Sequence, residues 1–166
     1  MALLELKNLK TFFATKRGTV KAVNGVSYSL DAGKVLGVVG ESGSGKSVSA
    51  MSILRLLDGN GYIDSGEILF NGQDLTKLSM NEMYKIRGNE ISVIFQEPMT
   101  SLNPVFTVSR QISEPLMIHQ GMNKKQAAAK AVELLSDVKI PNPEVVAKQY
   151  PHEFSGGMRQ RVMIAM

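Results

Sequence analysis

The sequence contains Gly40-Glu41-Ser42-Gly43-Ser44-Gly45-Lys46-Ser47, which fits the pattern G-x-x-x-x-G-K-[ST] at every position. The glycines of such a loop let backbone N–H groups converge on a phosphate, and the start of a following helix adds partial positive charge. Lys46 is expected to reach the β- and γ-phosphates of a nucleotide, and the Ser47 hydroxyl to bind Mg²⁺. The other candidate phosphate-binding residues of this loop are Gly40, Ser42, Gly43, Ser44 and Gly45.

The residues on either side of this loop supply the context that the pattern requires. The apolar run Val35-Leu36-Gly37-Val38-Val39 predicts a central strand that is covered on both faces. Residues 46–57 predict a helix with one apolar face, formed by Val48, Met51, Leu54 and Leu57. A buried strand, a glycine-rich loop and a helix in this order favour a phosphate site over a glycine-rich turn that precedes a helix by chance.

The first part of the chain carries further strand signals. Runs of β-branched and other apolar residues predict strands at residues 4–9, 20–30, 66–70 and 91–95. Residues 31–33 predict a turn, and Asn71-Gly72 is a strong signal for a tight hairpin.

The later part of the chain has a helical pattern. Helices are predicted at residues 108–119 and 123–138, the second with Asn123 as its N-cap, and a last helix begins after Ser155-Gly156-Gly157. A strand-rich part followed by a helical part indicates an α/β core with a helical subdomain. The expected organisation is a nucleotide-binding α/β core with an antiparallel β part, a helical subdomain, and the start of a final helix, at residues 1–96, 97–153 and 154–166.

Composition excludes several classes of protein. The 166 residues are 43% hydrophobic and 20% charged, which indicates a folded globular chain rather than a disordered one. No cysteine is present, so disulfide scaffolds, Cys-ligated zinc, Fe–S clusters and thiol catalysis are excluded within these residues. The net charge of +4 comes from basic residues spread along the chain, which argues against a nucleic-acid partner. The sequence also predicts no signal peptide and no transmembrane segment.

Two further motifs are ambiguous when each is taken alone. The predicted strand at 91–95 delivers Gln96 and Glu97 to the carboxyl end of the sheet, where ligands bind in open α/β folds. Gln96 is a candidate for orienting a water or contacting Mg²⁺. Alternatively, Glu97 is the acid that holds the metal, because an acid directly after an apolar run resembles the second nucleotide-binding motif. The third possibility is an ordinary strand end without a functional role. Ser155, followed by Gly156 and Gly157, is either an ordinary helix cap or a second anion site.

The order of these motifs resembles the ATP-binding subunits of ABC transporters. Residues 154–158 are similar to the LSGGQ signature of that family, with Phe154 replacing Leu and Met158 replacing Gln. The closer similarity is to the importer group for oligopeptides, dipeptides and nickel. Three stretches carry it: Gly40-Glu41-Ser42-Gly43-Ser44-Gly45-Lys46-Ser47, Phe95-Gln96-Glu97-Pro98-Met99-Thr100-Ser101-Leu102-Asn103-Pro104 and Tyr150-Pro151-His152-Glu153-Phe154-Ser155-Gly156-Gly157-Met158.

The resemblance implies a phosphate-loop NTPase fold and a role for each motif. Gln96 becomes the glutamine that approaches Mg²⁺ and the attacking water, which overrides the metal-acid reading of Glu97. Phe13, with Phe12 as the next candidate, is expected to stack on adenine, although core packing is the alternative. Two subunits of the family meet head to tail, so Ser155, Gly156 and Gly157 are expected to contact the γ-phosphate of ATP held by a second ATP-binding subunit. The resemblance also implies transmembrane permease partners and a peripheral place on the cytoplasmic face of the membrane.

The sequence departs from the family pattern after the signature. The family's next elements, an apolar strand ending in Asp-Glu, an Asp-containing loop and a switch His, have no counterpart in these residues, and His119 and His152 are expected to be ordinary subdomain or surface residues. We therefore expect a fragment that lacks the C-terminal part of the core, binds ATP weakly or not at all, and turns it over negligibly.

Two other functions remain as alternatives. One is a self-contained nucleotide-binding or regulatory module without catalysis, which would be a compact monomer that binds Mg-ATP tightly. The other is an ABC-type ATPase of DNA repair or translation, which the spread of basic charge and the stretch at residues 96–104 disfavour.

Overall fold

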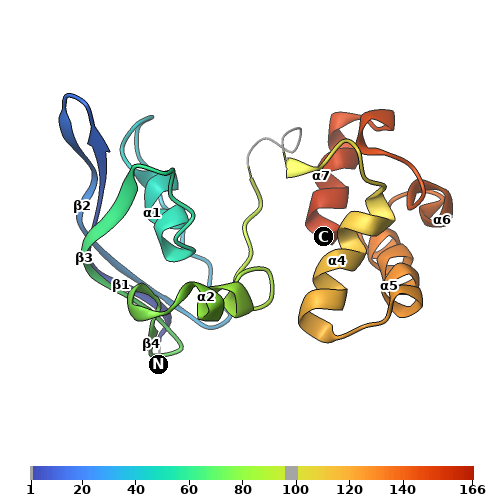
Figure 1. Cartoon of the computed structure of the whole chain (residues 1–166), viewed down its shortest axis with the longest axis horizontal. Coiled ribbons are helices and arrows are strands. Elements are labelled where there is room, and N and C mark those ends of the chain that lie inside the picture. The colour runs from blue at the N-terminus through green and yellow to red at the C-terminus, as the bar shows by residue number, and fades with distance from the viewer. Residues whose placement is uncertain (1, 96–100) are drawn as a thin grey trace. The chain divides into compact units, whose positions relative to one another are not determined.

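The computed structural model describes residues 2–95 and 101–166. Its chain divides into two compact units, Met1–Tyr84 and Lys85–Met166. The boundary falls near the end of helix α2 (Met80–Ile86), and the elements are labelled in Figure 1. Each unit is described by itself below.

The N-terminal unit is built on an antiparallel sheet with the strand order β2-β1-β3-β4. Its strands are β1 (Ala2–Thr15), β2 (Gly18–Asp31), β3 (Gly61–Phe70) and the short β4 (Gln73–Asp74). Leu6 of β1 pairs with Tyr28 on one side and Ile68 on the other, so β1 lies between its two long neighbours. The strands predicted at residues 4–9, 20–30 and 66–70 are confirmed.

The hairpin between β3 and β4 turns at the predicted dipeptide. Asn71 and Gly72 have φ values of 48° and 80°, and two successive positive φ angles are the requirement of a type I′ turn. Asn tolerates this left-handed region and Gly adopts it without a steric penalty, which explains why this pair stands here. The turn prediction is confirmed, and a 3₁₀ turn, η1 (Leu75–Lys77), and helix α2 (Met80–Ile86) follow.

Helix α1 (Lys46–Ile53) packs against β1 and β2, as Figure 1 shows. Leu6 and Leu9 of β1 and Ile68 of β3 are among the most buried residues of the unit. The helix is shorter than predicted, and its buried residues are Ser49 and Ser52. Of the predicted apolar face, Val48, Met51, Leu54 and Leu57, only Leu54 is fully buried.

Serine occupies the contact face of α1 because its hydroxyls find acceptors there. Ser49 Oγ donates to the Lys46 carbonyl at 2.8 Å, and Ser52 Oγ donates to the Val48 carbonyl at 2.6 Å. Side chains this small also allow the helix axis to approach the sheet closely. Satisfied hydroxyls carry little burial cost, so a helix can bury serines where the apolar periodicity alone predicts larger side chains.

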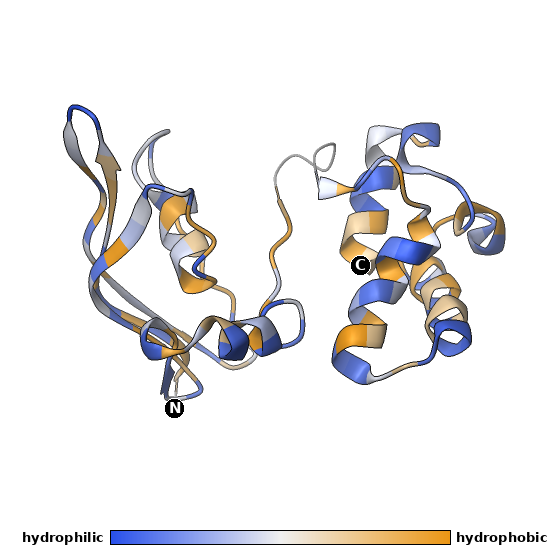
Figure 2. Cartoon of the chain, viewed as in Figure 1, coloured by the Kyte–Doolittle hydropathy of each residue, from blue (hydrophilic) through white to orange (hydrophobic). Residues whose placement is uncertain are grey.

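Two predicted strands, the central one at residues 35–39 and the one at residues 91–95, do not form in the structure. Residues 34–41 have no regular secondary structure, and Val35 and Val39 are 98% and 92% exposed. Within residues 91–95 the backbone forms only an isolated bridge between Ile91 and Arg87, and Figure 2 shows this apolar run as a plain trace. A strand requires a neighbour to pair with. The described strands of this chain pair only with one another, so neither run has one.

The C-terminal unit is helical. Its elements are α4 (Val108–Gln120), α5 (Lys124–Asp137), α6 (Pro143–Val146), the 3₁₀ turn η2 (Pro151–Glu153) and α7 (Gly156–Ala165). Their buried faces meet in one core, centred on Val108, Ile112, Ala131, Leu135 and Val162. The three helices predicted here are confirmed.

The caps of these helices follow the sequence signals. Asn123 Oδ1 accepts hydrogen bonds from the Lys125 and Gln126 amides at 3.0 Å, while Gln126 Oε1 accepts from the Asn123 amide at 3.0 Å. This reciprocal capping box fixes the start of α5. Gly121, with φ 64°, ends α4 in the left-handed conformation typical of a helix C-terminus. In the described part of the chain, no helix is both long and apolar enough to pass through a bilayer.

Candidate functional site

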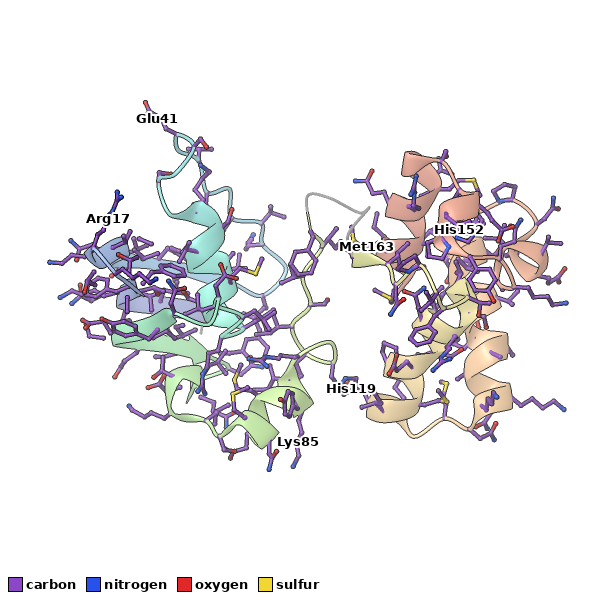
Figure 3. All side chains as sticks on the ribbon, turned by 45° about the horizontal axis from the view of Figure 1, so that its top comes forward. Arg17, Glu41, Lys85, His119, His152 and Met163 are labelled. Atoms are coloured by element: carbon purple, nitrogen blue, oxygen red, sulfur yellow. The ribbon has the colours of Figure 1, made fainter. Side chains whose placement is uncertain are left out.

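The glycine-rich loop closes around its own lysine. Lys46 stands at the first position of α1, and its Nζ donates to the carbonyls of Gly40 and Glu41, both at 2.7 Å. Nζ also lies 3.4 Å from Ser44 Oγ. Figure 3 shows Glu41 at the outer end of this loop, with its side chain directed away from the protein. The loop therefore turns two carbonyls and one hydroxyl toward a single ammonium group.

One glycine of the loop, Gly45, stands where a side chain does not fit, and a second, Gly40, lies close to a serine side chain that can turn away. A Cβ at Gly45, whose φ is 91°, would lie 2.3 Å from the Ala22 carbonyl oxygen of β2. A Cβ at Gly40 would lie 2.7 Å from Ser44 Oγ. The close approach of Gly45 to β2 anchors the start of α1 on the sheet, so this glycine fixes the position of the loop as well as its shape.

The start of α1 is suited to an anion. Gly45 occupies the N-cap position without a capping side chain, and the first turn contains no acidic residue. The first amides of a helix have no partner inside the helix and carry partial positive charge. Together with the Lys46 ammonium, these groups form a positively polarised loop that suits a phosphate chain.

Ser47 fits the predicted contact with a divalent cation. Its side chain is exposed, and within residues 2–95 and 101–166 its hydroxyl makes no hydrogen bond, so the oxygen remains open to a further ligand. Hydroxyl oxygen is a hard ligand of the kind that Mg²⁺ accepts. No group of three or more His, Asp or Glu side chains among the described residues forms a ready-made metal site, so such an ion would depend on nucleotide oxygens for its remaining ligands.

The two aromatic candidates for the adenine lie in different surroundings. The ring of Phe13 is half-buried and packs over Gly61 and beside Leu57: a Cβ at Gly61 would lie 2.7 Å from Phe13 Cε1. Phe12 is 8% exposed, and its ring meets Tyr62 edge to face at a centroid distance of 6.3 Å. Phe13 therefore has more ring surface to offer a ligand than Phe12 has.

The predicted second anion site lies in the C-terminal unit. Ser155 caps α7, with its Oγ accepting a hydrogen bond from the Met158 amide at 3.4 Å, as the cap prediction required. Gly156 and Gly157 are exposed, and a Cβ at either would meet no atom within 4 Å. The turn is therefore open to solvent. Gln96 and Glu97, the remaining candidates, lie outside the described residues.

Sequence reasoning missed a groove beside this turn. It has a volume of about 720 Å³ and is lined by Val145, Lys148, Gln149, Tyr150, His152 and Glu153. The rings of Tyr150 and His152, the second of which Figure 3 labels, stack with centroids 5.7 Å apart. Only the breaks around Pro141 and Pro143 signal an irregular surface here, and they do not specify a groove. His152 remains an exposed surface residue, as predicted.

One ionisable group near α1 whose pKa is shifted is a tyrosine that the sequence did not single out. Burial raises the pKa of Tyr28 above its ordinary value of 10.0, and a hydrogen bond with Ser49 partly offsets this effect. Tyr28 stays protonated in the neutral range, so it contributes packing and a hydrogen bond rather than charge beside the loop.

Comparison with known proteins agrees with the motif order. A family model described as ABC transporter matches residues 23–166. The chain is 54% identical over 165 residues to the oligopeptide transport ATP-binding protein OppD of Bacillus subtilis, a match that covers 99% of this chain and 46% of that protein. It is 51% identical over 164 residues to the dipeptide transport ATP-binding protein DppD of Lactococcus lactis, covering 98% and 47%. The chain therefore spans about half the length of the curated relatives it matches.

Solved structures give the same fold. The dimeric structure of MJ0796, described as a bacterial ABC transporter cassette, matches with a TM-score of 0.83 and 27% identity, covering 98% of this chain and 67% of that one. A dimeric post-hydrolysis state of MJ0796, bound to ADP and Pi, matches with a TM-score of 0.81 and 26% identity over the same shares. The predicted fold class, a phosphate-loop α/β fold with N-terminal antiparallel strands and a helical part, is confirmed.

Proposed function

Because the chain belongs to the ABC transporter family, we propose that it forms the nucleotide-binding part of an ATP-hydrolysing subunit that drives the import of peptides. The names of relatives that are 51–54% identical support peptides, rather than nickel, as the transported class. The observation that carries the proposal is the ring of loop groups around Lys46 Nζ.

Nucleotide binding then proceeds by exchange of hydrogen-bond acceptors. Lys46 donates to two neutral carbonyls, those of Gly40 and Glu41. The β- and γ-phosphate oxygens are charged acceptors, and a hydrogen bond to a charged acceptor is roughly twice as strong as one between neutral groups. Lys46 therefore turns from the loop carbonyls to the phosphates, and the first amides of α1 bind the same phosphate chain.

Mg²⁺ is the proposed companion of ATP at this loop. The Ser47 hydroxyl would bind it, and Gln96 is proposed as a second contact. When bound, the ion neutralises charge on the β- and γ-phosphate oxygens. The part of Ser47 is to hold the ion at the start of α1, next to the phosphate chain that Lys46 binds.

The remaining motifs have proposed partners of their own. Ser155, Gly156 and Gly157 would contact the γ-phosphate held by a second ATP-binding subunit, because all three are exposed and the two glycines have open space around them. Phe13 would stack on adenine. Membrane-spanning permease subunits would carry the peptide, which places the proposed subunit at the cytoplasmic face of the membrane.

Hydrolysis is proposed for the intact subunit, while the 166 residues alone are expected to turn ATP over negligibly. Lys46 and the helix amides bind phosphate, but the sequence offers no candidate general base beside the loop to activate water. Steady release of phosphate by the purified chain, lost in Lys46→Ala, would contradict this part of the proposal.

The binding proposal is tested by titrating the ¹⁵N-labelled chain with Mg-ATP and following backbone amide shifts. We expect weak binding that moves the amides of Gly43, Gly45 and Ser47. Lys46→Ala should abolish these shifts. Lys34→Ala, a matched control that removes an exposed lysine from the segment before the loop, should leave them unchanged. Equal shifts in wild type and Lys46→Ala would exclude the proposed role of this lysine. Tight binding by a monodisperse monomer would favour a self-contained nucleotide-binding module.

A further inference from the structure

Gln111 is a polar side chain buried in an apolar helix face. Gln111 is 7% exposed and lies on α4 between Val108 and Ile112, which are 0% and 1% exposed. A buried amide side chain is costly unless its hydrogen-bonding groups are satisfied. An apolar residue would fill the same place in the core, so the presence of an amide here must be explained by the hydrogen bonds that it makes.

All the partners of Gln111 belong to the loop before α4. Its Oε1 accepts from the Asn103 amide at 2.8 Å, and its Nε2 donates to the carbonyls of Asn103 and Phe106, both at 3.0 Å. The loop adds its own turn, in which the Val105 amide donates to Asn103 Oδ1 at 3.1 Å. One side chain therefore fixes the backbone of residues 103–106 directly onto the first turns of α4.

The start of α4 is in turn bonded to a distant part of the chain. The Val108 amide donates to the Gln149 carbonyl at 3.0 Å, and the Ser109 amide donates to the Ala147 carbonyl at 2.8 Å. These bonds satisfy two of the amides that a helix start leaves without partners. The segment that ends at Gln149 is therefore held by the same helix end that Gln111 ties to residues 103–106.

Hydrogen bonds continue from Gln149 to the turn at Ser155, Gly156 and Gly157, called the signature turn below. The next residue, Tyr150, donates its amide to Glu153 Oε2 at 2.6 Å, and the Glu153 amide donates back to the Tyr150 carbonyl at 3.0 Å. Phe154, 6% exposed, then anchors the chain in the core one residue before Ser155. A continuous set of bonded backbone segments thus runs from residues 103–106 to the turn at Ser155.

We propose that Gln111 is a positioning residue for the signature turn: it locks residues 103–106, the start of α4 and residues 147–155 into one rigid body. The importance of that turn for nucleotide rests on the proposed function, whereas the mechanical link does not. Coupling of this kind requires a measured effect at the far end of the network, because proximity along a chain of contacts does not establish it.

The experiment measures amide hydrogen exchange in the 166-residue chain without nucleotide. Gln111→Met keeps the side-chain volume and removes every hydrogen bond to residues 103–106. We expect exchange at the Asn103 and Phe106 amides to become roughly ten-fold faster, and the Glu153, Phe154 and Met158 amides to become faster as well. The Leu135 amide of α5, in the same core but off this network, should keep its rate.

Gln111→Glu and Ser113→Ala complete the design. The carboxylate that Gln111→Glu introduces would keep the acceptor for the Asn103 amide but turn its second oxygen toward the carbonyls of Asn103 and Phe106, so a change at Met158 at least as large as in Gln111→Met is expected. Gln111→Leu, which also lacks the amide, serves if Gln111→Met does not fold. Ser113 is also buried on α4 and its Oγ has no partner within the described residues, so Ser113→Ala should leave all these rates unchanged.

The proposal is overturned by either of two results. In the first, Asn103 and Phe106 exchange faster while Glu153, Phe154 and Met158 keep their rates, which would confine Gln111 to a local role. In the second, Leu135 accelerates as much as Met158, which would indicate general loss of stability. Mg-ATP binding is measured separately on the same variants, so failure of the proposed function would not be mistaken for failure of the link.

Discussion

Thr11 Oγ1 and Ser52 Oγ lie 2.8 Å apart, and both residues are 0% exposed. This contact joins the central strand β1 to α1, the helix that begins with the phosphate loop. Ser52 Oγ donates to the Val48 carbonyl, so the shared bond has Thr11 as its donor and Ser52 as its acceptor. The Thr11 hydroxyl therefore needs Ser52 as its acceptor, whereas the Ser52 hydroxyl keeps its bond to Val48 when Thr11 is removed.

Removing the acceptor should cost more than removing the donor. Ser52→Ala leaves the buried Thr11 hydroxyl without a partner, and we expect the free energy of unfolding of the N-terminal unit to fall by about 2 kcal/mol. Thr11→Val leaves the bond from Ser52 to Val48 intact and should cost less than about 1 kcal/mol. Exchange of β1 amides across a urea series measures both. A greater loss in Thr11→Val than in Ser52→Ala would reverse the assignment of donor and acceptor.

Gly45 and Gly43 should respond differently to alanine. Both have positive φ, 91° and 81°, but a Cβ at Gly45 meets the Ala22 carbonyl at 2.3 Å while one at Gly43 meets nothing within 4 Å. Gly43→Ala should cost about 1 kcal/mol, the strain of the left-handed region. Gly45→Ala should cost clearly more and shift the start of α1 away from β2. Thermal unfolding measures the loss of stability in each variant, and the amide spectrum of residues 20–24 reports the shift of α1. Equal losses of stability in Gly43→Ala and Gly45→Ala would show that the contact with Ala22 does not affect stability.

Gly157 is expected to be unfavourable for stability. It lies in α7 with no positive φ and open space around it, so Gly157→Ala should stabilise this helix by up to about 1 kcal/mol. If the turn approaches a phosphate of a second subunit, the same change should lower ATP hydrolysis by the intact transporter subunit. Calorimetry of the chain and a turnover assay of the subunit measure the two effects. A variant that is more stable and fully active would argue against close approach at this glycine.

Asp74 should make the hairpin sensitive to acid. Burial acts to raise the pKa of Asp74, but hydrogen bonds from Lys77 and Thr76 outweigh it and hold the pKa below its ordinary value of 3.8. A carboxyl group whose pKa is lower in the folded state stabilises the fold above its unfolded pKa, and this contribution is lost as the pH falls through the folded pKa.

Asp74→Asn tests this by removing the charge while keeping an acceptor for Thr76. We expect a loss of about 0.5–1 kcal/mol at pH 7, because one partner, Lys77, is solvent-exposed. The difference between the two proteins should shrink as the pH is lowered below about 4. Urea titrations at a series of pH values measure it, and a difference that does not change between pH 7 and pH 3 would exclude the charge of Asp74 as its source.

Features with local causes were predictable from the sequence. The turn at Asn71-Gly72, the capping box at Asn123 and the cap at Ser155 each depend on residues within four positions of one another. The phosphate loop belongs to the same class, because its pattern states in one stretch which positions need glycine and where the charge stands. The order of motifs was then enough to predict the fold class.

Features set by distant residues were not predictable. The apolar runs at residues 35–39 and 91–95 read as buried strands, yet a strand is buried only if other segments pair with it and cover it, and no run contains that information about itself. Ser52 is buried because Thr11, 41 positions away, offers a partner. Gln111 reads as an ordinary polar helix residue until its contacts with residues 103–106 are known.

The exposed stretch at residues 34–41 also determines where the chain can be cut. Proteases bind a substrate segment in extended form, and an exposed stretch without helix or strand meets that requirement with little local unfolding. Trypsin should therefore cleave after Lys34 before it reaches Lys46 inside α1. Such a cut separates the β1–β2 hairpin from the loop it anchors, so the intactness of a preparation at this one bond will govern whether its nucleotide-binding properties can be interpreted.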